Sequence, residues 1–316
     1  MTAKVFIDGA AGTTGLEIRE RLQGRREIDL VVLDEQRRKE AGARRDALNE
    51  ADVVILCLPD DAAREAVSLI VNPAVRVLDP STAHRVSDGW VFGFPELEKN
   101  RREELRNAKR VTNPGCYSTG FLALMRPLVR AGIVPSDWPV LCNAVSGYSG
   151  GGRAMIAEFE DKNASNYTHE VVRTYGLTLE HKHVDEMRVH AGLTHRPLFA
   201  PTVGRFYRGM LVEIPLQLWS LPGNPSLETV HAALADSYRG EPLVEVASLK
   251  ESAGKKTLDA EELRNTNRLK LYVFGNDGRR QARLIALLDN LGKGAAGASV
   301  QNLNVMMGWP ETTGLL

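Results

Sequence analysis

The sequence predicts an α/β protein with two domains. Apolar strand-like segments alternate with helix-like segments in the first third of the chain, which indicates βαβ units and a parallel sheet. A glycine-rich turn, GAAGTTG, joins the first strand to the first helix, as in a Rossmann-type dinucleotide-binding domain. After Cys116 strand-like runs dominate, which predicts an α+β substrate and dimerisation domain with a mostly antiparallel sheet.

Each element of the first domain follows from its local pattern. Near-continuous apolar runs are typical of strands that are buried on both faces. The predicted strands are 4–9, 28–34, 51–59, 75–79 and 108–115. The apolar spacing predicts helices over 16–24 and 60–70.

The second domain begins with a predicted helix over 119–132, which ends at a glycine with a proline close behind. Strands are predicted at 139–147, 209–219, 269–276 and 281–290, with a helix over 226–240. The last predicted helix, 294–308, is rich in small residues and can therefore pack closely against another element.

Length and composition indicate a soluble globular protein. The chain has 316 residues, enough for two domains of ordinary size, with 43% hydrophobic and 25% charged residues. Its 40 basic residues balance 40 acidic ones, so nothing in the charge favours nucleic acid or a membrane as a partner. We see neither a signal peptide nor a membrane-spanning run, and expect a cytoplasmic homo-oligomer, dimer or tetramer, with a small-molecule substrate.

The three cysteines differ in their surroundings. An odd and sparse set argues against a disulfide framework and for a reducing compartment. Cys57 and Cys142 lie in apolar runs and are expected to be buried strand residues. Cys116 follows Pro114 and Gly115 and precedes a helix, whose dipole and free N–H groups favour the nucleophilic thiolate. A structural cysteine at a turn is the alternative.

The turn from Gly9 to Gly15 has the context of a dinucleotide site, because it follows a strand and opens a helix. Glycines let the backbone approach a pyrophosphate, which the N–H groups of the helix start bind. The spacing of Gly9, Gly12 and Gly15 is not the commonest one, and a tight turn without a ligand would use the same residues. The βαβ context favours the cofactor.

The end of the second strand bears on the choice of cofactor. Asp34 stands where an acid usually binds the ribose 2′-hydroxyl of NAD. Arg37, Arg38 and Lys39 follow, and cations there suit the 2′-phosphate of NADP. A solvated charged loop is the third interpretation. The residues alone support NAD and NADP about equally.

The segment HKHVDEMRVH offers a proton-transfer group. On a helix, His183 and Glu186 share a face, so Glu186 could orient the imidazole as an acid or base. His181, His183, Glu186 and His190 could instead ligate zinc, or form a polar helix end. The spacing alone does not choose between these readings.

Three further positions are candidate anion ligands. SGYSGGGR, from Ser146 to Arg153, is a glycine-rich turn that could hold a phosphate or carboxylate, or be a mobile loop. Arg85 and Lys182 could also bind an anion, or be surface charges.

At this point the motifs resemble a known family. GAAGTTG, GFPEL, NPGCYSTG, SGYSGGGR, HKHVDEM and KGAAGASVQNLNVMMG occur in the order seen in N-acetyl-γ-glutamyl-phosphate reductases, most closely the shorter form. That family belongs to the superfamily of aspartate-semialdehyde dehydrogenase. Ser118 stands where the family often has proline, and Asp185 stands where proline commonly precedes the glutamate. Neither departure removes a reacting group.

The resemblance implies the roles of the site residues. Cys116 is the nucleophile, His183 the acid or base, with Glu186 nearby, and no metal is implied. The last helix, with Asn302, is expected to return to the first domain near the nicotinamide. This gives an NADP-binding domain of residues 1–115 with about 290–316, and a catalytic domain of residues 116–289.

The remaining site residues fall into two sets. The expected cofactor-binding residues are Gly9, Ala11, Gly12, Thr13, Thr14, Gly15, Arg37, Ser81, Gly147 and Asn302. The expected substrate-binding residues are Arg85, Asn113, Ser149, Gly150, Arg153 and Lys182.

The expected reaction is reduction of N-acetyl-glutamyl γ-phosphate to its semialdehyde in arginine biosynthesis. The Cys116 thiolate attacks the acyl phosphate, an oxyanion forms beside N–H donors, and phosphate leaves a thioester. NADPH reduces the thioester to the aldehyde, with His183 supplying the proton. An aspartate-semialdehyde dehydrogenase and a non-catalytic dinucleotide sensor are the alternatives.

Overall fold

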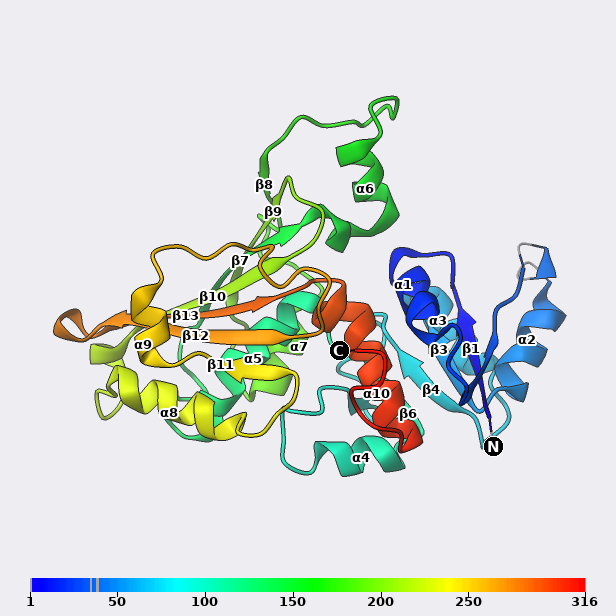
Figure 1. Ribbon diagram of the computed structural model, residues 1–316, viewed down its shortest axis with the longest axis horizontal. Coiled ribbons are helices and arrows are strands. Elements are labelled where there is room, and N and C mark those ends of the chain that lie inside the picture. Colours follow the sequence, from blue (N-terminus) through cyan, green and yellow to red (C-terminus); the bar gives the residue numbers. More distant parts are fainter. Residues whose placement is uncertain (1, 35, 38–39, 316) are drawn as a thin grey trace. The chain divides into compact units, whose positions relative to one another are not determined.

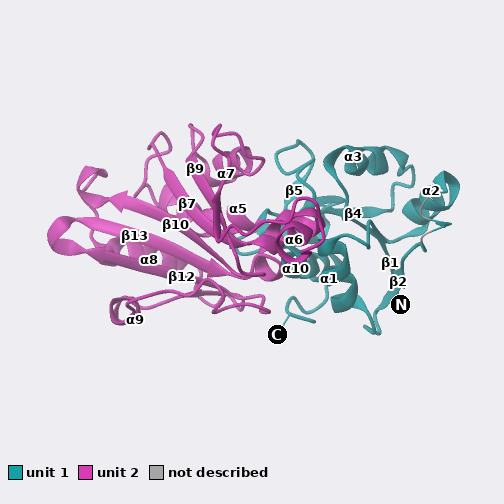
Figure 2. Cartoon of the chain, turned by 90° about the horizontal axis from the view of Figure 1, so that it is seen from above, with its two compact units in different colours: residues 1–115, 295–316 teal, residues 116–294 magenta. Residues whose placement is uncertain are grey.

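The computed structural model describes residues 2–34, 36–37 and 40–315. The chain divides into two compact units (Figure 2). The first unit consists of Met1–Gly115 and Ala295–Leu316, and the second of Cys116–Gly294. The first unit is therefore built from both ends of the chain, and the second unit from its middle.

The first unit contains a six-stranded parallel sheet. Its strands, in the spatial order β2-β1-β3-β4-β6-β5, are β2 (Ile28–Val31), β1 (Ala3–Asp8), β3 (Val53–Leu56), β4 (Arg76–Asp79), β6 (Arg110–Thr112) and β5 (Val91–Phe92). Every residue of β3 is buried, because the strand lies inside the sheet with helices packed over it. The predicted dinucleotide-binding architecture is confirmed.

The helices of the first unit form two groups by their mutual contacts. The first group consists of α1 (Thr13–Leu22), α4 (Arg101–Asn107) and α10 (Gly297–Met307). Helix α10 contacts α1, α4 and the strand β4. The other pair is α2 (Ala41–Glu50) and α3 (Asp60–Leu69). Helix α10 is buried from Gly297 to Met306, which its many small side chains permit.

The second unit contains a seven-stranded mixed sheet. Its strands, in the spatial order β11-β12-β13-β10-β7-β9-β8, are β11 (Val244–Val246), β12 (Leu269–Asn276), β13 (Gln281–Leu288), β10 (Met210–Gln217), β7 (Leu141–Gly147), β9 (Leu198–Gly204) and β8 (Val172–Thr174). The pairs β7/β9 and β11/β12 are parallel, and the other neighbours are antiparallel. The predicted mostly antiparallel sheet is confirmed.

Helix α5 (Cys116–Arg130) forms the core of the second unit. It packs on β10, β12 and β13 and against α7 (Val184–Ala191) and α8 (Leu227–Ser237). Gly120 permits the close approach to the sheet, because a Cβ atom there would lie 2.7 Å from Val212 Cγ2. Two more helices, α6 (Gly152–Glu160) and α9 (Leu249–Gly254), lie at the edges of the unit, and α6 projects beyond its sheet (Figure 1).

A proline inside α5 is compensated by a side chain. Pro127 has no N–H group to donate to the carbonyl oxygen of Ala123, four residues earlier. The hydroxyl of Tyr238, at the end of α8, donates to that oxygen at 2.9 Å. The helix therefore continues through the proline without leaving a buried carbonyl unpaired.

Several elements were not predicted from the sequence. They are α2, α4, α6, α9 and the strands β5, β8, β9 and β11. Most are short, α2 has few apolar residues, and β9 carries Pro201 at its centre. None of the described helices is long and apolar enough to cross a membrane.

Candidate active site

Cys116 is the first residue of α5, so its thiol lies at the helix start that the sequence predicts. It is half-buried, and a Cβ atom on Gly294 would come within 2.8 Å of Cys116 Cβ. Only glycine therefore fits beside this cysteine. The helix dipole favours a negative charge at this end, which is the form of sulfur that attacks carbonyl carbon.

The other two cysteines have different surroundings. Cys142 is buried in β7, as predicted, and burial raises the pKa of its thiol. The expectation that Cys57 is a buried strand residue is wrong, because β3 ends at Leu56 and Cys57 is only half-buried. Burial and the Asp79 and Asp8 carboxylates raise the pKa of the Cys57 thiol. Both thiols are therefore held in the protonated, unreactive form.

A cluster of rings surrounds Tyr117, the residue that follows Cys116. Tyr117 lies 5.9 Å from His181, 5.8 Å from His183 and 5.1 Å from Phe199, measured between ring centroids. The hydroxyl of Tyr175 donates to that of Tyr117 at 3.1 Å. The cluster thus brings both candidate histidines to the start of α5.

The two tyrosines are hydrogen-bonding groups rather than acids near neutral pH. Burial is the main cause that raises the pKa of Tyr117, and it raises the pKa of Tyr175 to about 12. The charge of Cys116 contributes to both shifts, which places both hydroxyls within electrostatic reach of the sulfur. Sequence reasoning missed Tyr117, Tyr175 and Phe199, because only folding brings them together.

His183 and Glu186 lie at the start of α7. The helix begins at Val184, so His183 is its N-cap residue rather than a residue inside the helix, and its carbonyl oxygen accepts the N–H of Met187 at 2.9 Å. Both side chains are buried, with 5% and 1% exposed. An orienting contact between them stays a prediction.

The neighbouring histidine is held in one tautomer. His181 Nδ1 accepts the backbone N–H of His183 at 3.2 Å. A nitrogen that accepts carries no proton, so His181 is neutral with its proton on Nε2 while this hydrogen bond stands. Among the described residues, no group of three or more His, Cys, Asp or Glu side chains is arranged to hold a metal ion.

The turn that follows β7 is closed by backbone hydrogen bonds. The N–H groups of Gly147, Tyr148 and Ser149 all donate at 3.0 Å to carbonyl oxygens in the segment 206–209. These three groups are therefore not available to an anion. Arg153, on α6, and Lys182 are both exposed, and no described contact connects them with this turn.

The first unit carries the other glycine-rich turn. Gly9 has a φ of +86°, and a Cβ atom there would lie 2.2 Å from the carbonyl oxygen of Cys57. Gly15 lies against the turn, since its Cβ atom would meet Gly9 O at 2.6 Å. Gly12 is the N-cap of α1 and offers no side chain to cap it, and nothing lies within 3.5 Å of its Cβ position. The helix start, with Thr13 and Thr14, is thus suited to an anion.

The loop after β2 forms hydrogen bonds to the carboxylate of Asp34. Asp34 Oδ1 accepts the N–H groups of Gln36 and Arg37 at 3.0 and 2.8 Å. The carboxylate therefore shapes the loop that carries Arg37, whose side chain is exposed. Arg38 and Lys39, the other cations considered for a 2′-phosphate, lie outside the described residues.

Ser81 and Arg85 belong to a segment organised by Asp79, whose side chain is completely buried. The Asp79 carboxylate accepts both the N–H and the hydroxyl of Ser81 at 2.8 and 2.9 Å, and it pairs with His84 at 2.6 Å. Arg85 donates to the carbonyl oxygen of Pro80 at 2.9 Å and is 9% exposed. These contacts hold the segment in place, and the Ser81 hydroxyl already donates its proton to Asp79.

Asn302 connects α10 with the end of the sheet in the first unit. Its Nδ2 donates to Gly93 O at 2.7 Å and to Asn113 Oδ1 at 2.9 Å. Asn113 in turn donates to Ala295 O at 3.1 Å. Asn302 is 0% exposed, and its Oδ1 has no hydrogen-bond partner among the described residues. A buried unpaired oxygen of this kind is unusual and is expected where a ligand supplies the donor.

Comparisons with known proteins agree with this architecture. Residues 4–108 match the semialdehyde dehydrogenase NAD binding domain, and residues 116–290 match the semialdehyde dehydrogenase dimerisation domain. The chain resembles the fold of aspartate semialdehyde dehydrogenase II from Vibrio cholerae, with a TM-score of 0.71 at 15% identity over 97% of this chain and 98% of that one. At that identity the likeness establishes the fold alone.

Sequence relatives are much closer. The N-acetyl-gamma-glutamyl-phosphate reductase of Trichormus variabilis is 53% identical over 99% of both chains. The reductase of the same name from Brucella ovis is 52% identical over 98% of this chain and all of its own length. The chain therefore belongs to the semialdehyde dehydrogenase family and, within it, to the N-acetyl-γ-glutamyl-phosphate reductases.

Proposed function

We propose that the protein reduces N-acetyl-glutamyl γ-phosphate to the semialdehyde with NADPH, through a thioester on Cys116. The observation that carries the proposal is the placement of Cys116 at the start of α5, with the His183 ring 5.8 Å from the ring of the adjacent Tyr117, measured between centroids. A nucleophile and a proton donor on one small cluster are what acyl transfer from a phosphate requires.

The residues of the first unit fit a nicotinamide dinucleotide, which supplies a hydride when bound. The uncapped start of α1 suits its pyrophosphate, because backbone N–H groups there lack partners within the helix. The unpaired Asn302 Oδ1 suits an amide donor such as the nicotinamide carboxamide. These are the groups that we assign to the cofactor, with Ser81 and Arg37 at its edges.

A phosphorylated cofactor is the better fit to the loop after β2. Asp34 is engaged by the N–H groups of its own loop, so it is less free to accept from a ribose hydroxyl. Arg37 is exposed and can pair with a 2′-phosphate. Comparing kcat/KM for NADP and NAD tests this, and a preference for NAD would reassign Asp34 to the ribose.

In the proposed reaction the sulfur of Cys116 is the only enzyme atom that bonds covalently to the substrate. Its thiolate attacks the γ-acyl carbon, the carbonyl oxygen becomes an oxyanion beside N–H groups of the helix start, and the carbon–oxygen bond to phosphate breaks. After hydride transfer to the thioester carbonyl, the carbon–sulfur bond breaks, which gives the aldehyde and restores the thiolate. The reaction takes up one proton, which ends on the released phosphate, and we assign its delivery to His183.

The substrate is tested most directly in the reverse direction. Purified protein, NADP and phosphate are mixed with N-acetylglutamate semialdehyde or with aspartate semialdehyde, and the nicotinamide absorbance is followed. One methylene discriminates weakly, by about 1–3 kcal/mol, whereas the acetamide and the ammonium differ in charge. We expect a higher kcat/KM for the acetylated substrate, and a ratio below one would reject it.

We further propose that the protein assembles through its second unit into a homo-oligomer, either a dimer or a tetramer. We also propose that it is located in the cytoplasm. The match to a dimerisation domain supports association of identical chains. One face of the sheet carries apolar side chains that are only half-buried, among them Leu211 and Phe274. Light scattering coupled to gel filtration measures the state, and a monomer at all concentrations would contradict the proposal.

A further inference from the structure

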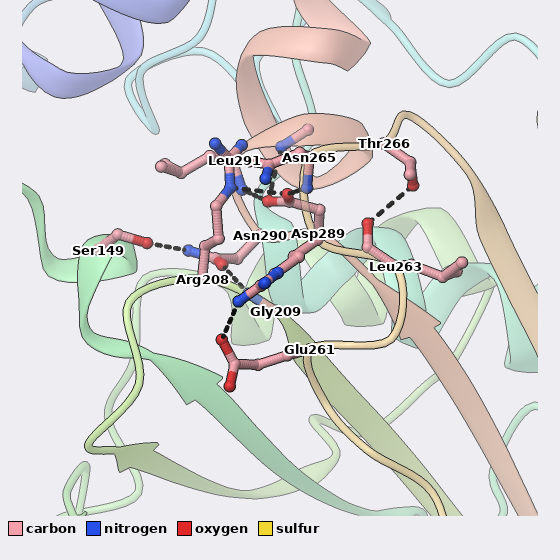
Figure 3. Close-up of polar contacts among 12 residues, drawn as sticks. Ser149, Arg208, Gly209, Glu261, Leu263, Asn265, Thr266, Asp289, Asn290 and Leu291 are labelled. Atoms are coloured by element: carbon pink, nitrogen blue, oxygen red, sulfur yellow. Dashed lines mark hydrogen bonds and ion pairs between the residues drawn. The ribbon is translucent and has the colours of Figure 1, made fainter. Parts of the chain in front are cut away.

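Asn290 is a buried amide that follows β13 and joins two segments of the second unit (Figure 3). Its side chain is 1% exposed. Its Oδ1 accepts the N–H of Gly209 at 2.8 Å, and its Nδ2 donates to the hydroxyl oxygen of Ser149 at 2.9 Å. The two contacts fix which end of the amide faces the serine, because the N–H of Gly209 can only donate.

The backbone that carries Asn290 is itself held in place. The Asp289 carboxylate is completely buried and accepts the N–H groups of Leu291 and Gly292 at 2.8 and 3.1 Å (Figure 3). It also pairs with Arg208 Nε at 2.7 Å. Asn290 therefore meets Ser149 from a rigid base.

The hydrogen bond from Asn290 determines what Ser149 can do. A serine hydroxyl has one proton to donate and two lone pairs that accept. Since Nδ2 of Asn290 only donates, Ser149 Oγ is the acceptor in their contact. Among residues 116–294, all of which the structure describes, no group accepts the Ser149 proton. Ser149 is 1% exposed, and its hydroxyl proton is left without an acceptor within the second unit.

The backbone of the same turn cannot serve in its place. The N–H groups of Gly147, Tyr148 and Ser149 are used by the segment 206–209. Gly150 lies directly against the cluster, since a Cβ atom there would be 3.3 Å from Ser146 Oγ and 3.5 Å from Asn290 Nδ2. The hydroxyl of Ser149 is thus a donor that this part of the turn still offers.

We propose that Asn290 is a positioning residue that holds Ser149 as the hydrogen-bond donor to an anionic oxygen of the substrate. The inference rests on the proposed function, whose substrate carries two anionic groups, a phosphate and an α-carboxylate. Both present oxygens that accept a hydroxyl proton, and a donor to a charged oxygen is stronger than a neutral pair.

The test begins with Ser149→Ala in the reverse reaction, with the KM values for phosphate and for N-acetylglutamate semialdehyde measured separately. Loss of a hydrogen bond to a charged group raises the KM for that ligand about tenfold or more. A rise for phosphate assigns the phosphate group, and a rise for the semialdehyde assigns the carboxylate. Unchanged KM values for both would overturn the proposal. Ser252→Ala, another buried serine of the second unit, is the matched control and should leave both KM values unchanged.

Asn290→Asp tests the positioning role. The aspartate keeps an oxygen for Gly209 but replaces the amide donor by an oxygen that accepts, so Ser149 would turn its proton toward residue 290. We expect the same KM to rise as in Ser149→Ala, with the Kd for NADP unchanged. In the Ser149→Ala background the same change should cost much less. An equal cost in both backgrounds would mean that residue 290 acts independently of Ser149.

The outcome is distinguishable from failure of the proposed function. Wild-type protein that turns over neither semialdehyde rejects the reaction itself. Wild-type protein that is active, with unaltered KM values in Ser149→Ala, rejects only the role of Asn290 and Ser149. If Asn290→Asp does not fold, Ser149→Ala alone still decides whether this hydroxyl binds the anion.

Discussion

Two glycine-rich turns, one in each unit, have similar sequences but differ in how their backbone N–H groups are used. Each follows a strand and leads into a helix, Gly9–Gly15 before α1 and Gly147–Gly152 before α6. In the first turn the helix start is left without a side-chain cap. The start of α6 also lacks a side-chain cap, but the N–H groups of residues 147–149 before it donate to carbonyl oxygens of another segment.

The difference indicates how each unit would bind its ligand. An uncapped helix start offers backbone N–H groups, which suit a pyrophosphate whatever side chains surround it. A turn whose backbone groups are engaged depends on side chains, here Ser149 held by Asn290. Substitutions in the first unit should therefore act through backbone geometry, and those in the second through individual side-chain groups.

The largest effect is expected for a side chain of the second unit. His183→Ala removes the assigned proton donor, so kcat should fall by about 10²–10⁴, with the Kd for NADP unchanged. Steady-state kinetics and a cofactor titration measure the two quantities. His190→Ala, on the same helix, is the control and should retain most of the activity. Equal losses in both variants would assign the effect to α7 as a whole.

A backbone substitution in the first unit should be next. Gly9→Ala places a Cβ atom 2.2 Å from Cys57 O in a residue with a φ of +86°, so we expect a loss of about 3 kcal/mol or more in unfolding free energy. Cofactor binding should weaken with it. Gly308→Ala, at a φ of +71° and a ψ of +19° with open space around it, should cost only about 1 kcal/mol. Thermal unfolding measures the loss of stability in both variants. Equal losses would contradict the view that close backbone contact is what constrains Gly9.

A smaller effect is expected in α5, where the Tyr238 hydroxyl takes the place of the backbone N–H that Pro127 lacks. Tyr238→Phe removes the hydroxyl that donates to Ala123 O, leaving that buried carbonyl unpaired beside Pro127. We expect a loss of about 1–3 kcal/mol in unfolding free energy and little change in kcat. Chemical denaturation measures it. An unchanged midpoint would show that another donor reaches this oxygen.

The smallest effect is a gain in stability. Ser118 is completely buried in α5, and its hydroxyl has no partner among the described residues. Ser118→Ala removes an unpaired polar atom and introduces a better helix former, so the free energy of unfolding should rise by about 1 kcal/mol. A lower melting temperature would indicate that the hydroxyl makes a hydrogen bond in solution.

Features that depend on neighbouring residues could be predicted from the sequence, whereas features that depend on contacts between distant segments could not. The turn Gly9–Gly15 was predicted with its strand and helix, because its glycines act on neighbouring backbone. The ring cluster of Tyr117, Tyr175 and Phe199 was not, since α5, β9 and the segment after β8 are distant in sequence. Asn290 was also missed, because its importance depends on meeting Gly209 and Ser149.

The second turn illustrates the limit most clearly. SGYSGGGR reads as an anion cradle, but nothing in it reveals that the segment 206–209 takes its first N–H groups. Likewise His183 belongs to a helical pattern, yet α7 begins one residue later. Local composition predicts candidate site residues, and the pairing of distant segments determines which of their atoms are available.

The central claim is a thioester on Cys116, and phosphate-free turnover tests it most directly. With N-acetylglutamate semialdehyde and NADP but no phosphate, the thiolate can be acylated but not released by phosphate. The account predicts a rapid burst of about one NADPH per active chain, an acyl group on the peptide that contains Cys116, and neither of these in Cys116→Ser. Steady NADPH formation without phosphate, or an undiminished burst in Cys116→Ser, would contradict it.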